Sequence, residues 1–282
     1  MAKESSIIGI DHWLTTPPGR YLVAWEQARL DLLVSNLFGY HAVQLGWPAL
    51  QGLRCNRMSH RWLVTDGSGD LGLAARAPEP VDETAIFPPS PLPLSVLAEY
   101  DALPFPSNSL DLVVLPHTLE LAADPHETLR EVERVLMPEG RVIILGFNPA
   151  SLWGAYKAGT DVAARVGWMQ PSVPGGTELI GWRRLRDWLR LLGFEHEGGQ
   201  FGCWRPPLAS STWLERTAWL DQAGARWWPV LGSAYVMVAV KRVRAMRLVG
   251  KAWKRKAASQ TASQTAPAAV ASRHGGAGNG RC

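Results

Sequence analysis

The sequence predicts an α/β protein with a parallel sheet, and residues 101–149 carry most of that prediction. Residues 111–116 (DLVVLP) and 141–147 (RVIILGF) are short, continuous apolar runs, a pattern typical of strands buried on both faces of a sheet. The segment between them has the marks of an amphipathic helix. Two parallel strands joined by a helix form a right-handed crossover, which is the basic unit of an α/β fold.

The helix of this crossover unit has a marked start and end. Asp124 can cap its N-terminus, Pro125 suits the first helical position, and Glu127 would complete a capping box. Pro138 and Gly140 are expected to stop it. Its apolar stripe has helical spacing and consists of Leu129, Val132, Val135 and Leu136.

The segments before this unit add a helix and further strands. Residues 20–37 have apolar positions at helical spacing and predict an amphipathic helix. Residues 41–46 (HAVQLG) and 60–66 (HRWLVTD) predict strands. Residues 77–94 are rich in proline, which favours an irregular surface loop, and residues 95–101 follow as a short strand or its flank.

The segments after the unit supply another helix and a last strand. Residues 150–178 have weak periodicity, so no helix or strand is assigned to them. Residues 181–192 (GWRRLRDWLRLL) predict a strong amphipathic helix, and residues 213–223 are a further helix candidate. Residues 234–242 (AYVMVAVKR) predict the strand that ends the folded body.

Tryptophan is concentrated in the second half of the chain. Ten of the fourteen tryptophans lie between Trp153 and Trp253, so they could line an apolar substrate pocket or offer stacking platforms. Packing in the core and at the surface is the role that the sequence favours, because most indoles pack. The six considered for a pocket are Trp182, Trp188, Trp213, Trp219, Trp227 and Trp228.

The net charge of +4 hides an asymmetry. From Lys241 onward there are ten lysines and arginines and no acid, so the first 240 residues carry 19 of the 29 basic side chains and all 25 acids, a net charge of −6. A uniformly basic nucleic-acid-binding protein would look different. The basic run could touch RNA phosphates or an acidic membrane surface, but a solvated extension is favoured. Residues 257–282 have a low-complexity composition that predicts disorder.

Composition also bounds the location and the chemistry. No secretory signal and no stretch that could span a bilayer is found in the sequence. The three cysteines are scattered and have no metal-ligand spacing, so we expect a reduced, cytoplasmic setting and no metal site.

The motifs of residues 101–149 resemble those of a known family. An acidic residue precedes an LPF turn, an aspartate opens the first strand of the unit, and an R-E-x-x-R-V-L-x-P-x-G helix leads to the second. In this order they resemble the second half of the cofactor domain of class I S-adenosylmethionine-dependent methyltransferases, most closely the type 11 group. The resemblance implies a Rossmann-like, mostly parallel sheet with a closing antiparallel strand and helical additions, and S-adenosylmethionine as cofactor.

This resemblance divides the chain into three parts. Residues 1–38 would be an N-terminal helical segment packed on the domain, and residues 39–242 the methyltransferase-like domain itself. Within that domain, residues 150–230 would form a tryptophan-rich region on the substrate side. Residues 243–282 would be the basic tail.

The resemblance also implies cofactor-binding residues. Asp101 would accept a hydrogen bond from the adenine amino group, with Ala102 and Leu103 beside the ring. Asp66 would hold the ribose hydroxyls, and Gly46 would match the first glycine of the family's Gly-rich loop. The alternative for Asp101 is a cap on a turn.

The first half of the domain departs from the family pattern. The segment that should read D/E-x-G-x-G-x-G reads QLGWPALQG, so Gln44 replaces the acid, and Trp47 and Pro48 follow the first glycine. Proline removes a backbone donor and the indole is large, which puts cofactor binding in doubt.

Three polar residues follow the strands of the crossover unit, where ligands of open α/β sheets bind. His117 is a candidate general base, and Glu120 and Asn148 are candidate substrate contacts; each could instead be a packed or solvated loop residue. The sequence therefore predicts a methyltransferase acting on an unidentified small-molecule or macromolecular nucleophile. The alternative is a catalytically degenerate binding or scaffold protein, with RNA reached only through the basic tail.

Overall fold

A computed structural model of the chain describes residues 13–66, 94–165, 179–208 and 210–242. They all belong to one unit, which spans Met1–Arg244. The predicted proline-rich loop, apart from Leu94, and the predicted disordered tail lie outside the described residues.

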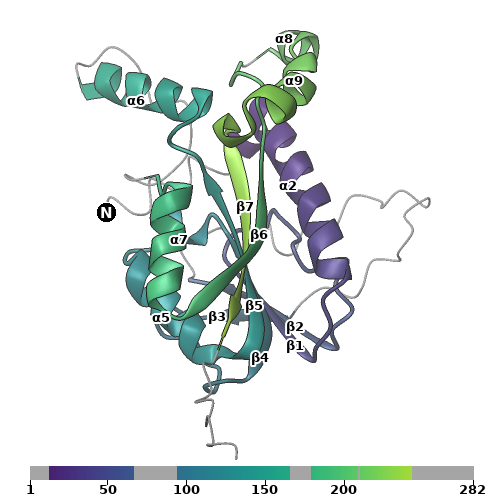
Figure 1. The fold of residues 1–282 in the computed structure, drawn as a ribbon, viewed down its shortest axis with the longest axis vertical. Helices are drawn as coiled ribbons and strands as arrows, with labels where there is room; N and C mark the ends of the chain where they lie inside the picture. Colours follow the sequence, from purple (N-terminus) through teal and green to yellow (C-terminus); the bar gives the residue numbers. More distant parts are fainter. Residues whose placement is uncertain (1–12, 67–93, 166–178, 209, 243–282) are drawn as a thin grey trace, which may run out of the picture. The chain divides into compact units, whose positions relative to one another are not determined.

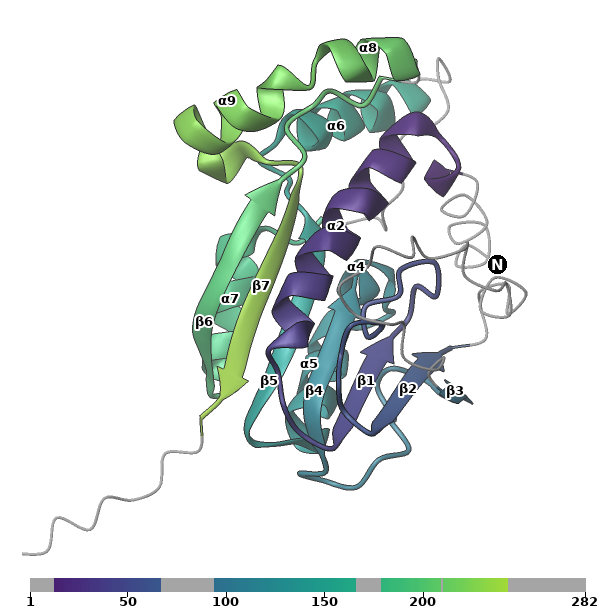
Figure 2. The same cartoon turned by 90° about the vertical axis from the view of Figure 1, so that its right-hand side faces the viewer.

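Seven strands form one sheet in the order β3-β2-β1-β4-β5-β7-β6, and Figure 2 shows them fanning out side by side. The first five strands pair in parallel, and β7 lies antiparallel to both of its neighbours, β5 and β6. The predicted fold class, a Rossmann-like and mostly parallel sheet with a closing antiparallel strand, is confirmed. The strands are β1 (His41–Leu45), β2 (His60–Thr65), β3 (Leu94–Leu97), β4 (Leu110–Pro116), β5 (Leu136–Phe147), β6 (Phe194–Gly202) and β7 (Ala234–Lys241).

Helices cover both faces of the sheet and crowd its upper end in Figure 1. Leucines and valines of α5 and α7 share one buried cluster with one face of the strands, and those of α2 share a second cluster with the other face. The helices are α2 (Pro17–Ser35), α4 (Thr118–Leu121), α5 (Pro125–Val135), α6 (Leu152–Arg165), α7 (Trp182–Leu191), α8 (Ser211–Arg216) and α9 (Trp219–Trp227), with a 3-10 turn η1 (Pro229–Leu231).

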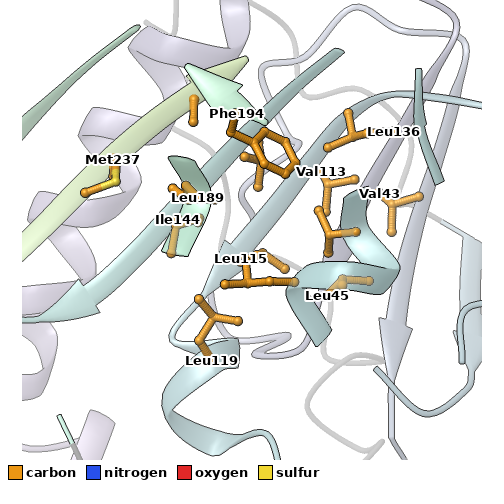
Figure 3. Packing of buried hydrophobic residues seen from close by; sticks show 14 of the residues in the cluster. Val43, Leu45, Val113, Leu115, Leu119, Leu136, Ile144, Leu189, Phe194 and Met237 are labelled. Atoms are coloured by element: carbon orange, nitrogen blue, oxygen red, sulfur yellow. The ribbon is translucent and has the colours of Figure 1, made fainter. Parts of the chain in front are cut away.

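The burial of both faces of strand β4 explains why its sequence is a continuous apolar run. Val113 and Leu115 point into the cluster with α5 and α7, which Figure 3 shows from close by, and Leu115 pairs with Ile144 of β5. Leu112 and Val114 point into the cluster under α2. Because both faces are covered, neither side of the strand can be polar.

The crossover helix begins as predicted and ends earlier. Asp124 accepts hydrogen bonds from the backbone nitrogens of His126 and Glu127, which confirms the N-cap. Glu127 pairs instead with Arg130, so the reciprocal half of the capping box is not among the described hydrogen bonds. The predicted stripe is buried on α5 and at Leu136.

The prediction that Pro138 and Gly140 stop this helix is wrong, because α5 ends at Val135 and both residues lie inside β5. Leu136 already pairs with Leu110, and the register between β4 and β5 shifts after that pair. An irregular start of the strand therefore replaces the expected loop.

Two further segments differ from what their local sequence patterns indicated. The weakly periodic segment after residue 150 contains α6. The helix candidate at residues 213–223 is broken into α8 and α9 by a turn at Thr217, whose hydroxyl donates to the carbonyl oxygens of Trp213 and Leu214. Of the helices that the structure describes, none is long and apolar enough to cross a bilayer.

Candidate functional site

A buried cluster of ionisable side chains lies where β4 ends. His117 follows β4 directly, Glu120 lies three residues later on α4, and Glu26 reaches the same point from α2. Nε2 of His117 is 2.7 Å from Oε1 of Glu26, and Nδ1 is 2.9 Å from Oε2 of Glu120. All three residues are buried. We call them the Glu26–His117–Glu120 cluster.

The backbone around His117 is specialised for this arrangement. His117 has a φ of 53°, in the left-handed region that non-glycine residues rarely adopt. Its amide donates to the carbonyl of Leu145 on the neighbouring strand β5. The second carboxylate oxygen of Glu120 accepts from the Phe147 amide at 2.8 Å. The ends of β4 and β5 therefore both contribute to the cluster.

The cluster keeps its histidine charged. Burial alone would lower the pKa of His117, but the two carboxylates outweigh it and raise that pKa to about 10. Burial raises the pKa of Glu120, and the hydrogen bond from His117 opposes that rise. At neutral pH the imidazole is thus an imidazolium with both nitrogens engaged, so it holds a proton and does not take one from a free partner.

Aromatic rings surround the cluster. The Trp47 ring meets the His117 ring edge-on at 4.5 Å between centroids, and the Phe147 ring lies 4.4 Å away. Trp13 and Trp153 extend the same buried group. This apolar packing lowers the local dielectric constant, which strengthens every electrostatic interaction inside.

Two polar atoms at the cluster have no hydrogen-bond partner among the described residues. They are Oε2 of Glu26 and Nε1 of Trp47, and both are buried. Buried polar groups are nearly always paired, so an unpaired acceptor and donor at one site indicate a place for a bound polar group or a water molecule.

The loop that follows β1 is held in a closed conformation by Gln44, a side chain of β1 itself. Nε2 of Gln44 lies within hydrogen-bonding distance of three loop carbonyls, those of Gly46, Trp47 and Leu50, and Oε1 accepts from the Gly52 amide. The loop therefore curls around a buried glutamine, and the Trp47 side chain fills the space over His117.

Two predicted cofactor residues, Gly46 after β1 and Asp66 after β2, lie near the same tyrosine. Gly46 has a φ of 73°, and a Cβ there would lie 2.9 Å from the Tyr100 hydroxyl. Burial, together with nearby Asp66, raises the pKa of Tyr100. Tyr100 precedes Asp101, which is exposed. Gly46 and Asp66 thus both lie near the Tyr100 hydroxyl, and Asp101 is linked to them only as the next residue in the chain.

The remaining predicted residues have structural contacts. Ala102 is exposed, whereas Leu103 is buried and its amide donates to Glu131. The Asn148 side chain donates to the carbonyls of Val230 and Gly232, so it ties η1 to the end of β5.

Glu26 is a site residue that was not predicted, and Trp47 was expected only to hinder cofactor binding, not to pack on His117. Glu26 had a usable signal, because it falls on the buried stripe of α2 between Leu22 and Leu30. A carboxylate on the apolar face of a helix is unusual unless it is paired. Its partner is 91 positions away in the sequence, so only the fold identifies it.

Comparisons with known proteins agree with this fold. Residues 77–144 match the family model of a methyltransferase domain of type 11. The uncharacterised protein YafS of Escherichia coli is 27% identical over 192 residues, 67% of each chain. A ubiquinone/menaquinone biosynthesis C-methyltransferase of Hahella chejuensis is 45% identical over 53 residues, and a malonyl-[acyl-carrier protein] O-methyltransferase of Halorhodospira halophila 42% over 60. The aligned segments span about a fifth of these two enzymes.

Two solved structures share the fold over most of the chain. One is a putative methyltransferase in complex with the Trm112 activator of Haloferax volcanii, with a TM-score of 0.55 and 16% identity over 85% of this chain and 99% of that one. The other is a possible histamine N-methyltransferase of Thermotoga maritima, with a TM-score of 0.53 and 15% identity over 85% and 97%.

Proposed function

We propose that this chain, which has the class I methyltransferase fold and belongs to the type 11 group of S-adenosylmethionine-dependent methyltransferases, transfers a methyl group to an unidentified nucleophile. The acceptor is a small molecule or the reactive group of a macromolecule. The observation that carries the proposal is the buried Glu26–His117–Glu120 cluster at the carboxyl edge of the sheet. Buried charge of this kind is costly to maintain and is typical of functional sites.

The family's cofactor, S-adenosylmethionine, supplies an electrophilic methyl carbon when it is bound. Two observations support binding of its nucleoside end: Asp66 follows β2 directly, and Gly46, with its left-handed backbone, puts no side chain between the loop and the Tyr100 hydroxyl. We assign the ribose to Asp66 and the adenine to Asp101 and Ala102, with Leu103 supporting the loop from the core.

At the part of the site where the methyl acceptor would bind, His117 acts by holding the carboxylates of Glu26 and Glu120 in place. Its imidazolium occupies one oxygen of Glu26, which leaves Oε2 as a buried acceptor without a partner among the described residues. That oxygen can take a hydrogen bond or a proton from the nucleophile, while Glu120 keeps His117 oriented. Asn148 borders the same part of the site, because its side chain holds η1 in place through a hydrogen bond.

A specific observation favours the alternative, a non-catalytic binding protein. Gln44 closes the loop that should open over the methionine end of the cofactor, and the Trp47 ring packs on His117. An enzyme would need the Trp47 side chain to move aside on binding.

Calorimetric titration of the full chain with S-adenosylmethionine and S-adenosylhomocysteine distinguishes the methyltransferase from the non-catalytic binding protein. We expect binding that weakens by about tenfold or more in Asp101→Ala, because a hydrogen bond to a charged group is lost. Asp187→Ala, which removes an exposed aspartate of α7, is the matched control and should bind normally. Absence of binding at millimolar cofactor would exclude the enzymatic function. Binding that is unchanged by Asp101→Ala would contradict only the assignment of Asp101 to the adenine.

A further inference from the structure

The Glu26–His117–Glu120 cluster carries more negative than positive charge. Both oxygens of Glu120 accept hydrogen bonds, from Nδ1 of His117 at 2.9 Å and from the Phe147 amide at 2.8 Å, so neither of them carries a proton. Oε1 of Glu26 accepts from Nε2 of His117 at 2.7 Å. Two carboxylates and one imidazolium therefore leave one negative charge in excess. No lysine or arginine among the described residues forms an ion pair with either carboxylate.

Burial makes this excess charge significant. All three residues of the cluster are buried, and an unbalanced charge in apolar surroundings is costly unless a cation or a strong hydrogen-bond donor is bound to it. The part of the chain that the structure describes supplies no such group, because Oε2 of Glu26 has no hydrogen-bond partner there. The cluster is therefore suited to a ligand group that donates a hydrogen bond and that is, or becomes, positively charged.

The aromatic wall of the cluster suits the same kind of ligand. The rings of Trp47 and Phe147 pack on His117, and Trp13 and Trp153 belong to the same buried group. Aromatic rings stabilise a positive charge at their faces and offer an anion nothing in return. None of the tryptophans considered from the sequence for a pocket belongs to this group. Trp182 and Trp188 pack on the core, and four are exposed and so do not pack as expected, namely Trp213, Trp219, Trp227 and Trp228.

The charge of the cluster discriminates between candidate methyl acceptors. A hydroxyl, a thiol or a carbon acid reacts as an anion, or must lose its proton to a base as it reacts. The cluster repels an anion, and its histidine already shares its protons with two carboxylates, so it offers no strong base. A neutral amine needs no base, because its lone pair attacks directly and the nitrogen becomes positive.

We propose that the methyl acceptor is the nitrogen of an amine and that Oε2 of Glu26 receives its N–H. This substrate class rests on the proposed methyltransferase function. The nitrogen lone pair forms the new N–C bond, the C–S bond of the sulfonium breaks, and its electron pair stays on sulfur, which leaves a neutral thioether. The positive charge thus passes from sulfur to nitrogen, and the methylated ammonium donates a hydrogen bond, and then its proton, to Oε2.

Three probes of similar shape distinguish the acceptor classes: benzylamine, benzyl alcohol and benzoate. Each is titrated by calorimetry into the full chain saturated with S-adenosylhomocysteine. We expect benzylamine to bind at least about tenfold more tightly than benzyl alcohol, because a hydrogen bond between charged partners is stronger than one from a neutral hydroxyl. Benzoate should not bind. With S-adenosylmethionine labelled at its methyl group, mass spectrometry should find N-methylbenzylamine and no methyl ether of benzyl alcohol.

Two variants separate the contact with Glu26 from the charge of the cluster. Glu26→Gln removes the charge and the carboxylate oxygen together and should weaken benzylamine binding by about tenfold or more. Glu120→Gln removes one charge but leaves Oε2 of Glu26 in place, so it should weaken that binding less. Glu215→Gln, which changes an exposed glutamate of α8, is the matched control and should bind benzylamine like the original chain. Circular dichroism and binding of S-adenosylhomocysteine show whether each variant is folded.

The comparison of the three probes uses the original chain, so it does not depend on the folding of any variant. The proposal is overturned if the chain saturated with S-adenosylhomocysteine binds benzylamine no better than benzyl alcohol, or does not bind it at all. It is also overturned if folded Glu26→Gln binds benzylamine unchanged, because Oε2 would then hold only a water molecule. Absence of S-adenosylhomocysteine binding would overturn the proposed function itself, and the amine acceptor with it.

Discussion

His117 is the residue on which the chemistry of the site depends most. It lies between two carboxylates at hydrogen-bonding distance, in a left-handed backbone conformation and away from water. Removing one member of a buried ion pair leaves the other uncompensated, which costs about 3–5 kcal/mol. The cluster therefore links the stability of the fold to the charge state of one imidazole.

The stability of the chain should depend on pH through this residue. The folded-state pKa of His117 is raised from 6.5 to about 10, so its contribution is fully present below pH 6.5 and is lost as the pH rises toward 10. Urea unfolding at a series of pH values should show a decline in the free energy of unfolding across this window. His117→Gln should be less stable at pH 6 and lack that decline; an equal slope in both proteins would contradict the assignment.

Trp47 should act as a lid on the methionine end of the cofactor site. Trp47→Ala should bind S-adenosylhomocysteine about tenfold or more tightly, because the site no longer has to displace the ring. The same change should lower the free energy of unfolding by about 3–5 kcal/mol, since Trp47 is buried in an aromatic cluster. Trp13→Ala, in that cluster but not in the loop, should lose similar stability without gaining affinity. If both variants bound S-adenosylhomocysteine more tightly, the gain in affinity would come from a general loosening of the aromatic cluster and not from removal of a lid.

At the scale of elements, the junction of α5 and β5 is held by one lysine. Nζ of Lys241, at the end of β7, donates to the carbonyls of Glu133 and Leu136 and to the Asn108 side chain. Its neighbour Arg242 forms only half-exposed ion pairs, with Glu139 and Glu195.

Substituting these two neighbours should have unequal effects. Lys241→Met should lower the free energy of unfolding by about 1–3 kcal/mol, because buried carbonyls lose their donor. Arg242→Met should cost at most about 1 kcal/mol, as expected for exposed pairs. Thermal and urea unfolding of both variants measure the difference, and equal losses would mean that the lysine does not cap the junction.

The elements that the sequence predicted are those with local signals. Strand β4 and the start of α5 follow from an apolar run and from Asp124 with Pro125, all within a few residues. The break between α8 and α9 could not be predicted in this way. It accompanies a hydrogen bond from Tyr21 to Asp221, which are 200 positions apart. Long-range contacts of this kind overrule local helical periodicity.

For the whole molecule, α2 connects the site to the rest of the unit. Its Glu26 reaches the end of β4, Gln27 bonds the loop after β1, and Tyr21 contacts α9. The sequence predicted this helix and, through family resemblance, the candidate residues Gly46, Asp66 and Asp101. It could not predict that Glu26 completes the cluster, because the position of Glu26 on the apolar stripe of α2 indicates a buried carboxylate but not its partner, which is 91 positions away in the sequence.

The strand order predicts which strands of the sheet unfold locally and which unfold only with the whole domain. Strand β7 is last in sequence but lies between β5 and β6, and its eight residues are all buried, so it cannot fray from the end of the chain. Strand β3 is a short edge strand with Leu94 and Leu97 exposed. In native-state hydrogen exchange, we expect amides of β1, β4, β5 and β7 to exchange together at the free energy of global unfolding, and β3 amides to exchange earlier. Early exchange of β7 would show that the closing strand forms a separate unit. In that case the Lys241 contacts, and not the strand order, would be what joins it to the parallel sheet.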